Sequence, residues 1–140
     1  MTDAPNIIGL DPGVTTGYAV WDRIKRTLLR VESMAIHQAM AVILAHREAG
    51  SLHMVVFEDA RLRTGYFGPN ARAKEQGAGS VKRDCKIWSD FLHDHGIAHL
   101  AISPKRKGAK LDAQRFAKLT GWASKTNEHG RDAAMLIFGR

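Results

Sequence analysis

The fold is decided near the start of the chain, by the run Asn6-Ile7-Ile8-Gly9-Leu10-Asp11-Pro12-Gly13. Its apolar part, residues 6–10, predicts a buried β-strand. Pro12-Gly13 then forces a turn directly after Asp11, so a carboxylate lies where the strand ends. Residues 17–21 alternate well enough for a second strand, and residues 27–33 for a third. The polar link between these two is short, which indicates a meander of hairpins.

Beyond the meander the pattern changes to helices alternating with strands. We expect helices over about 35–49, from Ser80 to Gly96, around 111–119 and over about 127–138, with strands over 53–57 and 97–102 between them. Residues 59–80 hold five Gly or Pro and little periodicity, and we expect a long functional loop there.

The order of these elements predicts a single α/β domain over residues 1–140. Its sheet would be five-stranded and mixed, a three-strand antiparallel meander plus parallel strands, with helices on both faces. The sequence has no run of apolar residues that approaches a membrane span and no apparent signal peptide. Cys85 is the only cysteine, which excludes an internal disulfide and agrees with a cytoplasmic location.

The formal net charge of +7 favours a polyanionic partner. Charge alone also suits a merely soluble basic protein, but the basic residues cluster. One group is Lys105, Arg106, Lys107 and Lys110; the other is Arg61, Arg63, Arg72, Lys74, Lys82 and Arg83. Two basic clusters on one scaffold indicate a nucleic-acid footprint.

Two carboxylates are predicted to face one another. Asp11 ends the first strand and Glu58 ends the fourth, and parallel neighbouring strands would bring them to the same edge of the sheet. Acids that close repel unless a cation or a bound proton neutralises them, and a hard cation such as Mg²⁺ accepts carboxylate oxygens. Asp59 is an alternative to Glu58, although strand alternation turns one of the two away.

The last expected helix carries His129 and Asp132, which a spacing of i,i+3 places on one face. The remainder of that helix is almost wholly apolar and must lie against the sheet. An Asp near a helix N-terminus also complements the helix dipole without any catalytic role. Its coincidence with Asp11 and Glu58 favours a shared site, with Glu128 as an outer neighbour.

The run from Ile8 to Gly13, followed by Thr16-Gly17-Tyr18-Ala19-Val20, resembles the opening of the RuvC-type Holliday junction resolvases, a family with the RNase H-like fold. Glu58 matches the family's second acid, and His129, Asp132 and Ala133 match its last motif. The motifs come in the family's order, so the resemblance covers essentially the whole chain. It implies an RNase H-like fold and cleavage of DNA four-way junctions.

The resemblance further implies hydrolysis of phosphodiesters with two Mg²⁺ or Mn²⁺ ions per site. Asp11 would bridge both ions, Glu58 and Asp132 would hold one each, and His129 would be a ligand or a general acid/base. The DNA would be held by Arg61, Arg63, Tyr66, Phe67, Lys82, Arg83, Lys105, Arg106, Lys107 and Lys110. Tyr66 or Phe67 would act at the junction centre, unless one of them anchors its loop to the core. A C2 homodimer would place one site on each of two strands.

Other functions fit parts of the same pattern. The opening motif also resembles phosphate-binding domains of the actin and sugar-kinase type, which work in pairs around a nucleotide, whereas this sequence has room for one. A nuclease of the same fold that acts on flaps, forks or RNA, or a non-enzymatic DNA-binding module, is a further alternative. The intact set of Asp11, Glu58 and Asp132 argues against a module without catalysis.

Overall fold

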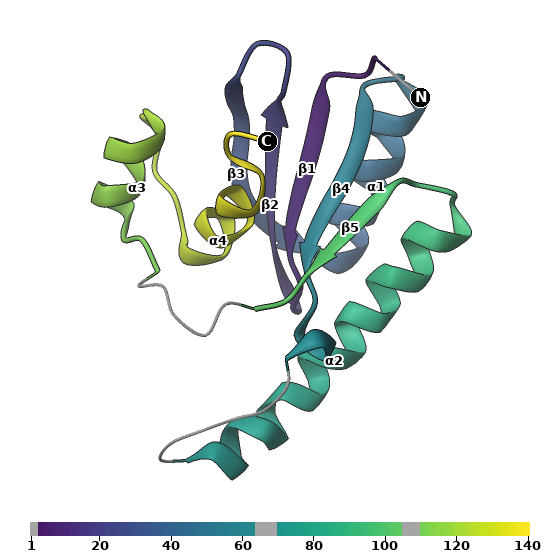
Figure 1. Ribbon diagram of the computed structural model, residues 1–140, viewed down its shortest axis with the longest axis vertical. Coiled ribbons are helices and arrows are strands. Elements are labelled where there is room, and N and C mark those ends of the chain that lie inside the picture. Colours follow the sequence, from purple (N-terminus) through teal and green to yellow (C-terminus); the bar gives the residue numbers. More distant parts are fainter. Residues whose placement is uncertain (1–2, 64–69, 105–109) are drawn as a thin grey trace.

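A five-stranded mixed sheet forms the centre of the computed structural model, which describes residues 3–63, 70–104 and 110–140 (Figure 1). The strands lie in the order β3-β2-β1-β4-β5. Their bounds are Asn6–Asp11 (β1), Thr15–Asp22 (β2), Thr27–Ala35 (β3), Leu52–Glu58 (β4) and His99–Ile102 (β5). The helices are Ile36–Glu48 (α1), Ala71–Asp94 (α2), Ala113–Thr120 (α3) and Glu128–Ile137 (α4), with a 3₁₀ turn η1 over Ala60–Leu62.

The pairing of the strands confirms the predicted meander and the predicted parallel pairs. β1 is antiparallel to β2, and β2 is antiparallel to β3. β4 lies parallel to β1 on its other side, and β5 lies parallel to β4. The crossovers that parallel pairing requires are supplied by α1 and α2, as expected for strands that alternate with helices.

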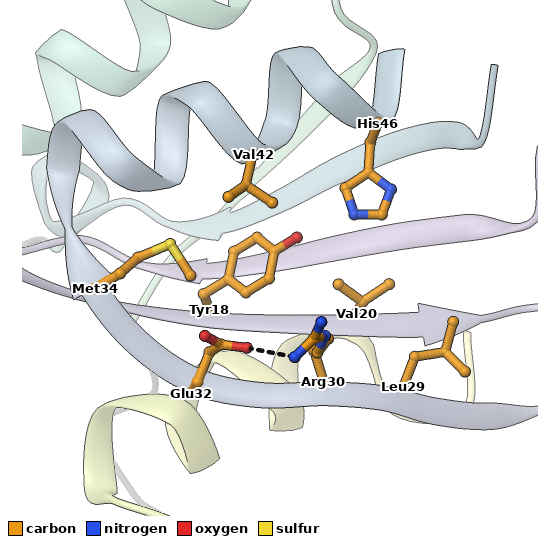
Figure 2. A pocket seen from close by; sticks show the side chains of 8 residues that line it. All are labelled: Tyr18, Val20, Leu29, Arg30, Glu32, Met34, Val42 and His46. Atoms are coloured by element: carbon orange, nitrogen blue, oxygen red, sulfur yellow. Dashed lines mark ion pairs between the residues drawn. The ribbon is translucent and has the colours of Figure 1, made fainter. Parts of the chain in front are cut away.

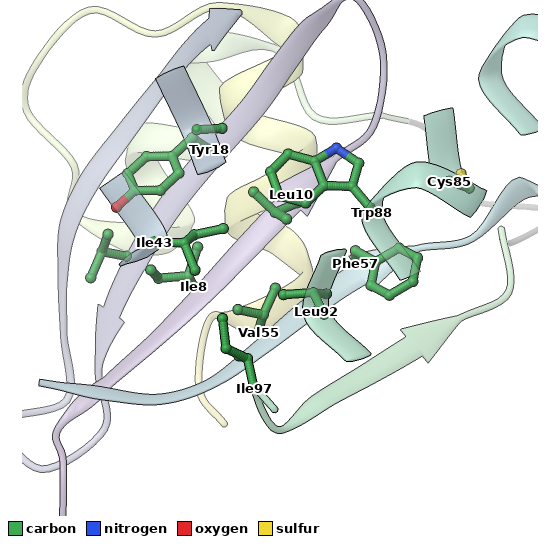
Figure 3. Close-up of a cluster of buried hydrophobic side chains, with 12 residues drawn as sticks. Ile8, Leu10, Tyr18, Ile43, Val55, Phe57, Cys85, Trp88, Leu92 and Ile97 are labelled. Atoms are coloured by element: carbon green, nitrogen blue, oxygen red, sulfur yellow. The ribbon is translucent and has the colours of Figure 1, made fainter. Parts of the chain in front are cut away.

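The helices cover both faces of the sheet because successive strand residues point to opposite sides. On one face Ile8, Leu10 and Phe57 pack against α1 and α2; Figure 3 shows this cluster around the fully buried Trp88. On the other face Ile7 and its neighbours pack against α3 and α4. Each large side chain buried in this way contributes about 1.5–3 kcal/mol.

The predicted start of the second long helix is wrong. Ser80 does not cap that helix, because α2 already begins at Ala71 and its first turns extend away from the sheet (Figure 1). The long loop predicted over 59–80 is therefore shorter, and it begins with η1. Gly77 and Gly79 had suggested a loop, but each glycine costs a helix only about 1 kcal/mol relative to Ala. Ala71 and Ala73 favour a helix, and the same helix continues into the turns that pack Cys85, Trp88 and Leu92 into the core.

The remaining helices and the last strand match their predicted positions within two or three residues. β5 is shorter than expected, since it begins at His99 instead of residue 97. Gly121 ends α3 with a φ of 76°, a left-handed conformation that favours glycine. Within the part of the chain that the structure describes, no helix is long and apolar enough to cross a membrane.

Candidate active site

Asp11 and Glu58 lie at the same edge of the sheet, at the ends of neighbouring parallel strands. In the register between β1 and β4, Leu10 pairs with Phe57, so Asp11 and Glu58 follow as the next residues on each strand. Both side chains are partly buried. The predicted parallel pairing of these two strands is confirmed, and it brings the two acids to the same edge of the sheet.

Helix α4 brings His129 and Asp132 to this edge. The imidazole Nδ1 of His129 lies 3.3 Å from Oδ2 of Asp11. Such a close approach requires Gly17 on β2, because a Cβ added there would overlap the backbone carbonyl oxygen of His129. A Cβ at Gly9 on β1 would similarly overlap the carbonyl of Ala133. These two strand glycines allow α4 to lie directly against the sheet.

The start of α4 is fixed by its capping residue. The side-chain oxygen of Asn127 accepts a hydrogen bond from the backbone N–H of Gly130 at 2.8 Å. Its amide nitrogen donates to Ser33 Oγ on β3 at 2.7 Å. Asn127 thus caps the first turn of α4, which carries His129, and also bonds that turn to the sheet.

The acids at this edge influence one another electrostatically. Burial raises the pKa of Asp11 above its ordinary value; the nearby charge of Asp132 adds to the rise, and the hydrogen bond from His129 opposes it. Burial also raises the pKa of Glu58, and the charges of Asp11 and Asp132 raise it further. Asp11, Glu58 and Asp132 therefore form one electrostatic cluster, which we call the acidic cluster.

Lys110 contacts this cluster. Its Nζ lies 3.0 Å from Oδ2 of Asp132 and 3.1 Å from Oε1 of Glu128. The hydrogen bond to Asp132 is the main reason that the pKa of Lys110 is well above its ordinary value. The positive charge of Lys110 also offsets part of the rise in the pKa values of Asp11 and Glu58. Lys110, predicted to bind a phosphate, is here bonded to site carboxylates.

The donor set of the acidic cluster suits a hard divalent cation. Carboxylate oxygens from three separate elements, with an imidazole beside them, are ligands that Mg²⁺ or Mn²⁺ accepts. Mutual repulsion between Asp11 and Glu58 is the charge imbalance that such an ion would relieve. Within the described residues, no three His, Cys, Asp or Glu side chains lie close enough together to hold a metal ion in the arrangement observed.

Asp59, the alternative to Glu58, faces away from the cluster. Its side chain is only 3% exposed and forms a bidentate ion pair with Arg61, whose Nη2 lies 2.8 Å from Oδ2 and whose Nε lies 3.0 Å from Oδ1. Burial alone would raise the pKa of Asp59, but the hydrogen bonds from Arg61 outweigh it and hold that pKa low. Arg61, one of the residues predicted to bind DNA, is thus engaged by an internal carboxylate.

Three of the other residues predicted to bind DNA lie in the part of the chain that the structure describes. Arg63 lies near the acidic cluster, since its charge lowers the pKa of Glu58. Lys82 and Arg83 lie on α2, half-buried and exposed respectively. Five further residues of the predicted set lie outside the residues that the structure describes: Tyr66, Phe67, Lys105, Arg106 and Lys107.

Arg131 is a positioning residue that the sequence did not single out. Its Nε donates to the backbone carbonyl of Leu111 at 3.0 Å, and its Nη1 donates to Thr126 Oγ1, also at 3.0 Å. Arg131 thereby ties the segments on either side of α3 to α4. Only its place beside Asp132 in a buried helix signalled such a role.

Two surface cavities lie elsewhere on the molecule. One, of about 290 Å³, opens between β2, β3 and α1 and includes Tyr18, Arg30 and His46 among its lining residues (Figure 2). The other, of about 420 Å³, lies near His53 and Ile97. Neither is lined by a residue of the acidic cluster. The side chains of Asp11 and Asp132 are 20% and 23% exposed, so both acids reach solvent.

No family model matches this chain, and a search of characterised proteins finds no significant match either.

Proposed function

We propose that this protein is a metal-dependent endonuclease that cleaves branched DNA, with the fold and chemistry of the RuvC-type, RNase H-like resolvases. The observation that carries the proposal is the acidic cluster: Asp11, Glu58 and Asp132 come from two parallel strands and a helix and interact electrostatically at one edge of the sheet. They lie on the elements where the resemblance requires them. The pKa values of Asp11 and Glu58 are raised, and carboxylates with raised pKa values at a strand edge are typical of a site for a catalytic cation.

Each residue of the acidic cluster and its neighbours would have a role in cleavage. Bound divalent ions would supply an activated water and stabilise the leaving oxygen. Asp11, Glu58 and Asp132 would hold those ions, with Asp11 central because its strand pairs with β4 and its carboxylate contacts His129 of α4. His129, at 3.3 Å from Asp11, is placed to hold or move a proton at its imidazole. Arg63 and Lys110 would offer positive charge to the phosphate.

A branched-DNA partner accounts for the charge of the protein. The net charge of +7 suits a polyanion, and Lys82 and Arg83 place part of it on α2. A homodimer would suit the approximate two-fold symmetry of a four-way junction. Ile87 on α2 is 42% exposed and is one apolar contact that a second copy could cover. The proposed place of action is the cytoplasm of a bacterium, or of a host if the gene is carried by a phage.

The proposal is tested with end-labelled four-way junction, linear duplex, single-stranded DNA and RNA, each with Mg²⁺ or EDTA. We expect cleavage of the junction in Mg²⁺ and none in EDTA. The matched pair of variants is Glu58→Gln in the cluster and Glu48→Gln at the exposed end of α1. Only the first should lose cleavage. Cleavage that persists in EDTA or in Glu58→Gln would refute the proposal, and cleavage restricted to RNA would assign a different substrate.

A further inference from the structure

Lys110 forms an ion pair with Asp132 of the acidic cluster and a second one with Glu128. Its ammonium is shared between Asp132 and Glu128, at 3.0 and 3.1 Å. Asp132 is 23% exposed, whereas Lys110 is 65% exposed. One end of the pair is therefore fixed in the acidic cluster and the other extends into solvent.

The backbone that follows Lys110 is held in place by hydrogen bonds, and these keep Lys110 close to Asp132. Leu111 accepts the hydrogen bond from Arg131, which stands next to Asp132 in α4. Asp112 then caps α3 by accepting from the backbone N–H of Arg115 at 2.8 Å. The main chain that follows Lys110 is thus held against the helix that carries its partners, while the long side chain can still swing.

A divalent cation at the acidic cluster would need the same carboxylate that Lys110 now holds. Asp132 Oδ2 accepts from Lys110, and Asp132 is one of three acids that we assign to the cation. A carboxylate oxygen that gains a divalent ion interacts less favourably with an adjacent ammonium, because the two cations repel. Binding of the lysine ammonium to Asp132 therefore weakens binding of the ion there, and binding of the ion weakens the contact with the lysine.

We propose that Lys110 is an exchangeable counter-ion of the acidic cluster, which holds Asp132 and Glu128 while no divalent cation is bound and passes to a substrate phosphate when one binds. The exchange with the cation stands on the contacts of Lys110, whereas its transfer to phosphate rests on the proposed function. Binding of the cation would in this way prepare a phosphate contact at the edge where the DNA is cut.

The first test measures cation binding without DNA. Calorimetric titration with Mn²⁺ compares the wild type with Lys110→Met and with Lys118→Met, which removes the same charge from an exposed position on α3. Lys110→Met should bind Mn²⁺ about tenfold more tightly, the effect of removing one competing charge at contact distance. Lys118→Met should stay within about twofold of the wild type. Equal affinity of Lys110→Met and the wild type would overturn the exchange.

The second test measures affinity for an uncleaved four-way junction in Ca²⁺ and in EDTA. Lys110→Met should weaken binding in Ca²⁺ by about fivefold, one lost phosphate contact, and leave binding in EDTA unchanged. An equal loss in both conditions, or no loss in either, would overturn the transfer to phosphate. If the wild type binds no nucleic acid at all, the proposed function fails, and the Mn²⁺ titration alone decides the exchange. Circular dichroism of each variant checks that it is folded.

Discussion

His129 Nδ1 lies 3.3 Å from Asp11 Oδ2, and this contact joins the last helix to the first strand across 118 residues of chain. It is possible because the two strand glycines, Gly9 and Gly17, let α4 approach the sheet at backbone distance. The apolar remainder of α4 provides the packing that holds the contact in place, with Ala133, Ala134 and Ile137 fully buried. Core packing and the candidate site thus depend on the same helix.

Replacing the site acids should separate cleavage from binding. We expect Asp11→Asn, Glu58→Gln and Asp132→Asn each to reduce the cleavage rate about 100-fold or more, because each removes a ligand charge from the cation site. Junction affinity in EDTA should persist. Single-turnover cleavage and a gel-shift assay measure the two properties, and Glu48→Gln is the control. Full activity in any of the three would remove that residue from the site.

In the metal-free protein, the stability that Asp11 and Glu58 contribute should fall as the pH rises through the carboxyl range. The pKa values of Asp11 and Glu58 are raised, so the folded state holds these protons more tightly than the unfolded chain does. Their contribution to the free energy of unfolding is therefore greatest below their ordinary pKa values and falls as the pH rises toward the raised ones.

The measurement is urea unfolding in EDTA between about pH 4 and about pH 8, a range that spans the ordinary carboxyl values and those above them. The double variant Asp11→Asn, Glu58→Gln should gain on the wild type as the pH rises. A gain that is the same at both ends of the range would show that the two acids do not carry the effect.

Gly17→Ala should disrupt the site through packing. The added Cβ would meet the His129 carbonyl, which belongs to a capped helix and cannot move without displacing α4. We expect a loss of about 3 kcal/mol or more in the free energy of unfolding, together with loss of cleavage. Gly79→Ala is the control, because nothing lies within 4 Å of its added Cβ and the change should stabilise α2 slightly. Equal stabilities of the two variants would contradict the close packing of α4.

DNA binding should depend strongly on salt, with Lys105, Arg106, Lys107 and Lys110 contributing part of the dependence. Each phosphate contact on duplex DNA adds a slope of about −0.9 to log affinity against log salt. Replacing all four by Ala should make that slope shallower in a Ca²⁺ buffer, measured by fluorescence anisotropy. An unchanged slope would place the DNA on other basic residues, such as those of α2.

Much of the fold could be predicted from the sequence because strand alternation and turn residues are local signals. Asp11 and Glu58 follow apolar runs, so their place at strand ends was predictable, and parallel pairing then brought them together. The start of α2 is not evident from the sequence, because Gly77 and Gly79 favour a loop locally, whereas the structure continues the helix through both.

Contacts between distant segments could not be predicted in the same way. The bond between Lys110 and Asp132 depends on how α3 is tied to α4, and Arg131 forms that tie through a backbone carbonyl that no side-chain pattern reveals. The pairing of Arg61 with Asp59 was equally hidden, although alternation had indicated that either Glu58 or Asp59 faces away.

The aromatic pair Tyr66 and Phe67 stays a prediction for the junction centre. Stacking on an unpaired base is worth about 1–3 kcal/mol, so replacing both by Ala should reduce junction cleavage far more than it reduces the melting temperature. The test also measures the cleavage rate of linear duplex under the same conditions. Sedimentation at micromolar protein concentration gives the oligomeric state. A monomer, or equal cleavage of duplex and junction, would leave a general nuclease in place of a junction resolvase.

The most direct test of the central claim is a calorimetric titration of the wild type and of Asp11→Asn with Mn²⁺. If the acidic cluster is a cation site, the wild type binds Mn²⁺ with saturation and the variant, which lacks the central carboxylate, binds at least about tenfold more weakly. If both proteins bind Mn²⁺ with the same affinity, or neither binds it, the cluster is not a cation site and the account of this protein as a metal-dependent nuclease is wrong.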